Sequence, residues 1–242
     1  LNGSGSDIFL RDLNSNTTEL VSVNFAGTGG GNGPSTDAAF SSDARYVAFE
    51  TDATDLFAGD TNNATDILVR DRLGGSNILI SVNLAGTGGG NGPSYDAYIS
   101  TDGRYVVFES DASDLVAGDT NQSTDVFVRD LLAHATRAVS TSTWGVGTGN
   151  DAAYFCSLSP DGRYIAFESR ATNLVANDIN GSLYDVFLRD TLVNSTALVS
   201  ANCNGTGSGN GNSYSGQVSS DGRYITFASW AWDLANGDYS AG

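Results

Sequence analysis

Two short motifs recur four times along this chain of 242 residues, and they share one interval. The first reads D-[IV]-[FL]-[LV]-R-D and begins at Asp7, Asp66, Asp125 and Asp185. The second contains S-x-D-[GA]-R-Y, with its arginine at Arg45, Arg104, Arg163 and Arg223. Both motifs return after 59, 59 and 60 residues. Two markers with one period indicate a repeat protein, in which each repeat is one supersecondary unit.

Each repeat has the pattern of four short β-strands. Runs of β-branched and aromatic residues are bounded by Gly, Asp and Asn, and no helix-length segment keeps a 3.6-residue period. In the second repeat we expect strands near 95–100, 104–109, 125–129 and 137–140. Four antiparallel strands per repeat are typical of a propeller blade. The first strands share a small residue, as expected near a crowded propeller axis: Ala38, Ala97, Cys156 and Gly216.

The phase of the repeat predicts how the blades are divided. The chain opens with the last two strands of a blade (7–23) and closes with the first two strands of another (216–232). We therefore predict an all-β single domain, 1–242, forming a four-bladed β-propeller of four-stranded antiparallel blades, with the ring closed where 7–23 pairs with 216–232. Its expected parts are a half blade at 1–24, blades at about 35–83, 94–142 and 153–201, and a half blade at 213–242.

Two other assemblies fit the same phase. The chain could be a piece of a longer array, or its tail could complete the head of a second copy and build a head-to-tail filament. Ring closure within one chain has the advantage that it removes exposed sheet edges.

The glycine-rich run AGTGGGNGPS occurs twice, at 26–35 and 85–94. In both places it follows an expected fourth strand and precedes the first strand of the next blade. Phosphate-binding glycine loops are followed by a lysine and a helix N-terminus, and this run has neither. We interpret it as the connector between blades.

The Asp-Gly pairs before Arg104, Arg163 and Arg223 are typical of tight hairpin turns, because glycine accepts a positive φ. Ala44 stands in place of the glycine in the first repeat, so a turn with positive φ there would be strained. The arginines that follow these turns are expected to form structural ion pairs with aspartates of the R-D motifs or of the turns themselves.

These motifs resemble the TolB-like β-propeller repeat of bacterial periplasmic and secreted proteins. SPDGRYIAFES followed by NLVANDINGSLYDVFLRD carries the resemblance, which extends over the whole chain in four copies. It implies a propeller that serves as an interaction platform, without a shared catalytic residue. It also implies an extracellular, cell-surface or periplasmic location.

The charge of the chain limits the classes of partner that it can bind. The net charge is −17, and all eleven basic residues are arginine. Such a chain repels nucleic acid and anionic lipid. No apolar run approaches the ~20 residues of a membrane-spanning helix, so membrane insertion is not expected. The remaining partners are a protein, a glycan or a second copy of the chain.

The loop between the second and third strands carries oxygen ligands at calcium-like spacing. The pattern D-x-N-x-x-x-D, with one extra residue in the third copy, comprises Asp60, Asn62, Asp66, Asp119, Asn121, Asp125, Asp178, Asn180 and Asp185. A structural Ca²⁺ ion is one interpretation. The alternative is an Asx turn, in which the side chain bonds to its own backbone.

Seven N-x-[ST] sequons predict a glycoprotein. They occur at Asn2, Asn16, Asn63, Asn121, Asn180, Asn194 and Asn204. The alternative is that Asn, Ser and Thr serve here as turn formers. A glycan on Asn121 or Asn180 would also conflict with calcium binding by the same side chain.

Signals of catalysis are weak, and we predict that the chain is not an enzyme. His134 has no equivalent in the other repeats, and neither Cys156 nor Cys203 has a histidine nearby in the sequence. These two cysteines form either one disulfide or two free thiols. Glu50, Glu109 and Glu168 recur with the repeat, which favours a structural role over that of glycosidase carboxylates.

Trp230 and Trp232 alternate with Ala231 and are expected to share one face. They could bind a sugar or a protein partner, or fill the seam where the ring closes. The first functional interpretation is a non-enzymatic extracellular structural or interaction propeller, for example a glycosylated surface or filament subunit. The alternative is a carbohydrate- or protein-binding propeller, and a glycoside hydrolase comes third.

Overall fold

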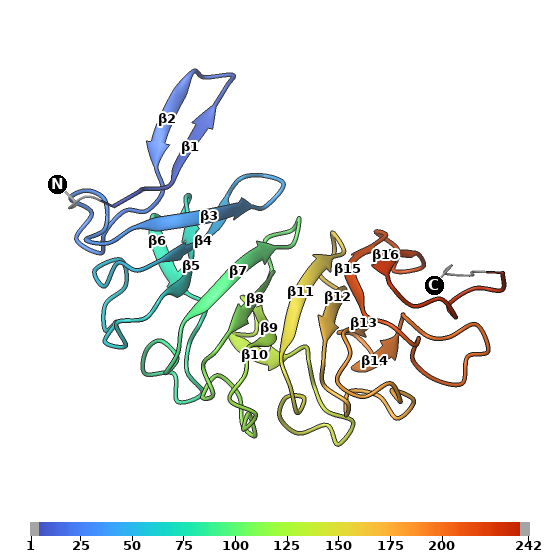
Figure 1. The fold of residues 1–242 in the computed structure, drawn as a ribbon. Coiled ribbons are helices and arrows are strands. Elements are labelled where there is room, and N and C mark those ends of the chain that lie inside the picture. The colour runs from blue at the N-terminus through green and yellow to red at the C-terminus, as the bar shows by residue number, and fades with distance from the viewer. Residues whose placement is uncertain (1–4, 238–242) are drawn as a thin grey trace. The chain divides into compact units, whose positions relative to one another are not determined.

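The structure is a computed structural model, which describes residues 5–237 apart from the side chain of Cys156. The described residues form β-strands and turns, without a helix (Figure 1). The strands are β1 (Phe9–Asp12), β2 (Thr17–Leu20), β3 (Ser35–Phe40), β4 (Tyr46–Thr51), β5 (Asp66–Asp71), β6 (Ser76–Leu79), β7 (Ser94–Ile99), β8 (Tyr105–Ser110), β9 (Asp125–Asp130), β10 (Ala135–Ala138), β11 (Ala153–Leu158), β12 (Tyr164–Ser169), β13 (Asp185–Asp190), β14 (Ser195–Leu198), β15 (Ser213–Val218) and β16 (Ile225–Ser229).

The strands form the sheets that the repeat predicts. Three four-stranded sheets have the orders β3-β4-β5-β6, β7-β8-β9-β10 and β11-β12-β13-β14, and β1-β2 and β15-β16 form two-stranded sheets (Figure 1). The predicted all-β fold of four-stranded antiparallel blades is confirmed. Within the second repeat, the first three strands lie within one residue of their predicted bounds, whereas β10 lies two residues earlier than predicted. Closure of the ring between 7–23 and 216–232 stays a prediction.

The middle strands of each blade form its core. In β4, the side chains of Val47, Ala48 and Phe49 are all buried, which requires packing on both faces of the sheet. A buried cluster in the first repeat joins Val47 and Phe49 to Leu68 and Leu79 of the neighbouring strands. Burial of these apolar side chains is the main stabilising contribution to the blade.

The first strand of each blade contains a β-bulge. Pairing between β3 and β4 shifts between Thr36 and Ala39, and equivalent shifts occur in β7, β11 and β15. Asp37 and Asp96 adopt positive φ angles of 50° at this point. The small residues predicted to lie in a crowded region sit at these bulges, but their burial varies. Ala97 is buried whereas Ala38 is exposed.

The glycine-rich connector is a structured element, as well as a link between strands. Val23 and Gly30 form an isolated antiparallel bridge, and Gly27 at the turn has a φ of 69°. Asn32 then exchanges hydrogen bonds with the following blade: its Oδ1 accepts from the backbone N–H of Thr54 at 2.9 Å, and its own N–H donates to Asp55 at 2.8 Å. The same exchange recurs at Asn91, Asn150 and Asn210.

The glycine of an Asp-Gly turn packs closely against the tyrosine that follows the arginine of the preceding blade. A Cβ on Gly103, which has a φ of 74°, would lie 2.4 Å from Cδ2 of Tyr46 in the preceding blade. Glycine is therefore required at this position both for its φ and for the close approach of the tyrosine ring. Ala44, at the equivalent place in the first blade, has a φ of 52°, so the predicted positive φ and its strain are confirmed.

Contacts divide the chain into two compact units. One comprises residues up to 116 together with 129–136, and the other comprises 117–128 together with the residues from 137 onward. The predicted single domain, 1–242, and its blade bounds stay predictions. Among the residues described, no helix has the length and apolar character needed to cross a membrane.

Candidate functional site

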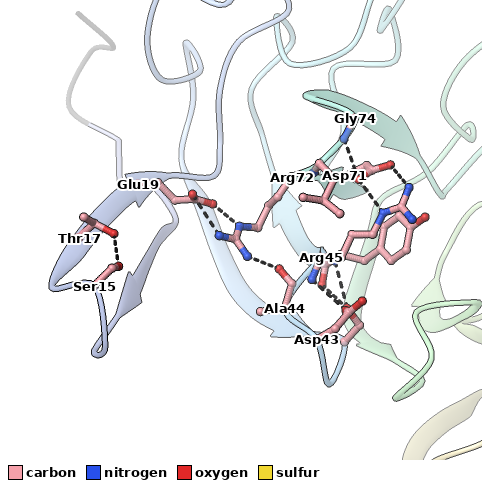
Figure 2. A network of polar contacts seen from close by, with 12 residues as sticks. Ser15, Thr17, Glu19, Asp43, Ala44, Arg45, Asp71, Arg72 and Gly74 are labelled. Carbon is pink, nitrogen blue, oxygen red and sulfur yellow. Dashed lines mark hydrogen bonds and ion pairs between the residues drawn. The ribbon is translucent and has the colours of Figure 1, made fainter.

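The repeated arginines form structural ion pairs. Arg45 donates from Nε and Nη2 to the two carboxylate oxygens of Asp71, at 3.1 and 2.9 Å (Figure 2). The same bidentate pair joins Arg104 to Asp130 and Arg163 to Asp190. Each pair links the start of a second strand to the end of a third strand, and hydrogen bonding to arginine lowers the pKa of each aspartate. The predicted pairing with the R-D motif is confirmed for these three.

The acidic loop residues predicted for calcium form a hydrogen-bond network. Asp125 is fully buried, and its Oδ1 accepts from Ser140 Oγ at 2.7 Å while its Oδ2 accepts from Asn121 Nδ2 at 2.8 Å. Asn121 Nδ2 also donates to the carbonyl of Gly149 at 2.9 Å. Asn62 and Asn180 make the same bonds, to Asp66 and Asp185, in their repeats.

Burial of these aspartates favours their neutral form. Desolvation raises the pKa of Asp125 to about 8 and the pKa of Asp66 and Asp185 to about 6, although the serine and asparagine donors act in the opposite sense. Asp60, Asp119 and Asp178 at the start of each loop also have raised pKa values, with burial as the main cause. Asp119 and Asp178 accept from the connector residues Thr148 and Ser208 at 3.1 Å, whereas the buried Oδ1 of Asp60 has no hydrogen-bond partner among the described residues.

This geometry favours the Asx-turn interpretation. The Oδ1 of Asn62 accepts from the backbone N–H of Ala64 at 3.1 Å, and the Oδ1 of Asn121 accepts from the N–H of Ser123 at 2.9 Å. The amide oxygens of these two residues thus bond to the backbone of their own loop, whereas the buried Oδ1 of Asn180 has no hydrogen-bond partner among the described residues. Across residues 5–237, no group of three or more Asp, Glu, His or Cys side chains is arranged to hold a metal ion. Calcium binding stays a prediction.

The sequons fall into two structural classes. The first class is exposed on turns or connectors: Asn16, Asn63, Asn194 and Asn204. Asn121 and Asn180 are half-buried, and the Nδ2 atom that a glycan would modify already donates to a carboxylate and to a carbonyl. Asn2 lies outside the described residues. Glycosylation stays a prediction, which the exposed class fits better than the half-buried class.

The repeated glutamates bind the bulge of the next blade. Glu50 accepts from the backbone N–H of Asp96 at 2.6 Å, and Glu168 accepts from the N–H of Ser215 at 2.9 Å. Burial raises the pKa of Glu50, with the neighbouring aspartates acting in the same direction. Glu109 is buried, with 6% of its surface exposed. These contacts favour the structural role that repetition predicts.

Cys203 is a free, exposed thiol at the start of a connector. The sequence left a disulfide with Cys156 and two free thiols as alternatives, and the free thiol of Cys203 corresponds to the second; the side chain of Cys156 lies outside the described part of the chain. His134 is exposed and has a φ of 53° in the turn between β9 and β10, as expected for a surface turn residue.

A row of aromatic side chains in the second unit is a feature that the sequence did not reveal. Tyr154 lies 6.3 Å from Tyr184 between ring centroids, Tyr184 lies 5.5 Å from Tyr214, and Tyr214 lies 6.2 Å from Trp230. Arg170 lies over the ring of Tyr184 at 5.9 Å. We call these four rings the aromatic row. Tyr154 and Tyr214 are one repeat apart, but Tyr184 and Trp230 hold other positions of the repeat, so the repeat period alone does not group the four rings.

The predicted pair of tryptophans lies at the end of this row. Trp230 and Trp232 are 77% and 55% exposed, while Ala231 between them is buried. This alternation fits the shared face that the sequence predicts. Of the two, Trp230 contacts the aromatic row, through the edge-to-face arrangement with Tyr214.

No protein-family model matches the chain, and no curated protein sequence matches it. Its structure is similar to that of a putative TolB from Agrobacterium tumefaciens, with a TM-score of 0.50, 19% identity, and coverage of 96% of this chain and 66% of the other. The chain has the fold of a TolB-like β-propeller. TolB from Acinetobacter baumannii matches with a TM-score of 0.46 and 20% identity over 92% of this chain and 48% of its own. This TolB-like propeller therefore spans less than two thirds of the length of either TolB structure.

Proposed function

We propose that this TolB-like propeller is a non-enzymatic, extracytoplasmic binding protein that contacts a protein partner through the aromatic row. The row itself is the observation that carries the proposal. Tyrosine and tryptophan are enriched at protein interfaces, because they bury large rigid surfaces while keeping a polar atom accessible. The aromatic row forms such a surface. Its three tyrosines are half-buried, and the tryptophan at its end, Trp230, is 77% exposed.

The charge near the row supports a protein partner. Arg170 stacks on Tyr184 and lies 3.8 Å from Asp151, so a cation stands beside the rings in a chain whose net charge is −17. Arginine beside aromatic rings is a common combination at interaction hot spots. At the equivalent place in the first two repeats, Asp52 bonds to Thr65 and Asp111 bonds to Tyr95. The aromatic surface is therefore a departure from the repeat.

The roles of glycosylated surface subunit and filament subunit remain compatible with this proposal. The exposed sequons at Asn16, Asn63, Asn194 and Asn204 would place glycans on turns and connectors, and none of these residues belongs to the aromatic row. A carbohydrate ligand is the second candidate, since exposed aromatic rings also stack on sugars. A hydrolase is disfavoured because Glu50 and Glu168 bind backbone N–H groups of the neighbouring blade.

The test compares wild-type protein with Trp230→Ala and with Trp144→Ala as a matched control. Trp144 is 82% exposed but lies in a connector, outside the aromatic row. Each protein is immobilised and exposed to extracellular and periplasmic protein fractions and to a glycan array. We expect a specific protein partner whose affinity falls about tenfold or more with Trp230→Ala and is unchanged with Trp144→Ala. Binding only to glycans would replace the protein partner, and equal loss with both variants would contradict a role for the row.

A further inference from the structure

A cavity of about 630 Å³ lies in the second unit, beside β13 and β14. Arg189 and Thr196 come from these two strands, and Asn194 comes from the turn between them. Thr143 of a connector and Leu174 of the loop after β12 complete opposite walls. Cavities of this volume are typical of small-molecule sites that combine apolar walls with a few convergent polar groups.

Arg189 is a buried cation without an ion-pair partner among residues 5–237. Its side chain is 7% exposed, and its guanidinium donates from Nη1 to Thr196 Oγ1 at 3.0 Å and from Nη2 to Asn194 Oδ1. Asp190 is adjacent in sequence, but its carboxylate oxygens accept from Arg163. A buried charge that lacks a counter-charge is strongly destabilising, so an arginine in this position calls for an anion.

A second cation lies close to Arg189. Burial lowers the pKa of Arg189, and the nearby charge of Arg137 lowers it further, while Asp190 acts in the opposite direction. Arg137 is on β10 and is exposed, and no ion pair is found for it in the described part of the chain. Arg137 does not line the cavity, but it adds a second positive charge that acts on Arg189 in an otherwise strongly acidic chain.

The first unit contains a cavity at the equivalent place in the repeat, and there a glutamate stands at the position of Arg137. There, a cavity of about 220 Å³ is lined by Arg70, the repeat equivalent of Arg189. The carboxylate of Glu19 bonds to Arg72, which is the main cause of its lowered pKa, and the charge of Arg70 lowers this pKa further (Figure 2). Glu19 and Arg137 occupy the same position of the repeat. The position that carries a carboxylate in the first unit therefore carries an arginine in the other unit.

We propose that the cavity beside Arg189 binds a small carboxylate ligand, whose carboxylate is held by the guanidinium group of Arg189 and attracted by the positive charge of Arg137. The planar donor fork of arginine matches a carboxylate in two parallel hydrogen bonds. Hydroxyl and amide side chains at Thr143, Asn177 and Thr196 suit a ligand that carries further polar groups. Acidic sugars and acylated acidic amino acids share this chemistry. The site is independent of the aromatic row and of its protein partner.

Isothermal titration of the purified protein with matched acid and neutral probes tests the site. The acids are glucuronate and N-acetylglutamate, and their neutral counterparts are glucose and N-acetylglutamine. We expect at least one acid to bind one site per chain, about tenfold or more tighter than its neutral counterpart. The tighter acid identifies the ligand source as a sugar or an amino acid. Failure of both acids to bind, or equal binding of a neutral counterpart, would overturn the proposal.

Substitutions at Arg137 locate the site without altering a buried residue. Arg137→Glu introduces the carboxylate that the first unit has at this repeat position, so the positive charge that attracts the ligand becomes negative and acid binding falls about ten- to a hundredfold. Arg137→Lys keeps the charge and retains binding within a few-fold. Arg223→Glu makes the same change of charge at an exposed arginine of another blade and leaves binding unchanged. Unchanged binding by Arg137→Glu, or equal loss with Arg223→Glu, would overturn the assignment.

Discussion

Arg104 and Asp130 join the second and third strands of their blade through two parallel hydrogen bonds, at 3.0 and 2.7 Å, while the guanidinium of Arg104 stacks on Tyr105 at 4.8 Å. The aspartate is almost buried and the arginine is 41% exposed. One side chain therefore combines a bidentate ion pair with a cation–π contact, and both contacts recur at Arg45 and Arg163.

Substitution of Arg104 tests how much this pair stabilises the blade. Arg104→Lys keeps the charge but loses the bidentate geometry, and Arg104→Ala loses the stacking as well. We expect the melting temperature to fall by a few degrees with lysine and further with alanine. The control is Arg223→Ala, because Arg223 stacks on Tyr224 without an ion pair among the described residues. Equal effects of the two alanine variants in thermal unfolding would show that stacking alone matters.

The strained turn of the first blade offers a stabilising substitution. Ala44 has a φ of 52°, where the equivalent turns have glycine. We expect Ala44→Gly to increase the free energy of unfolding by roughly 0.5–1 kcal/mol, after the greater freedom of glycine in the unfolded chain is deducted.

The reverse change, Gly103→Ala, should be strongly destabilising. It adds both the positive-φ strain and a contact of 2.4 Å between the new Cβ and Tyr46. Denaturant unfolding of both variants measures the difference, and a stabilised Gly103→Ala would contradict the role assigned to the tyrosine.

The buried aspartates predict an unusual dependence of stability on pH. Asp125 has a folded pKa of about 8, above its ordinary value of 3.8, so the folded state binds its proton more tightly than the unfolded state does. Its contribution to stability is then complete below pH 3.8 and is lost as the pH rises through about 8. Asp66 and Asp185 lose theirs as the pH rises through about 6.

The aspartates paired with arginine have pKa values lowered below the ordinary 3.8. Their contribution to stability is therefore present above pH 3.8 and is lost as the pH falls below that value. We therefore expect maximal stability at mildly acidic pH and a falling melting temperature toward pH 8. Asp125→Asn should flatten this fall, because the amide that replaces the carboxyl does not titrate. A melting temperature that rises steadily from pH 5 to pH 8 would refute the assignment.

Removal of divalent cations distinguishes the two interpretations of the acidic loops. Because Asp66, Asp125 and Asp185 already accept hydrogen bonds from serine and asparagine, we expect a chelator to change the melting temperature by less than about 1 °C. A rise in melting temperature that grows with calcium concentration would instead establish a bound ion.

Local patterns in the sequence predict much of this fold. The strands, the turn at Ala44 and the ion pairs of Arg45, Arg104 and Arg163 follow from residue types at fixed spacing. The bulges do not, because Asp37 and Asp96 take positive φ without the glycine that would signal it. The aromatic row and the contrast between Glu19 and Arg137 were not predicted either. They occur at positions where the repeats differ, and the repeat motifs describe only the positions that the repeats share.

The hydrogen bonds of the connector have a consequence for synthesis of the chain. Asn32 and Asn91 each bond to a loop about 22 residues further along, beyond the next pair of strands. A blade emerging from the ribosome therefore cannot fix its trailing connector until part of its successor has also emerged. During synthesis, each connector would become ordered only after the first two strands of the next blade have emerged. The connector made most recently would then be the one exposed to proteases.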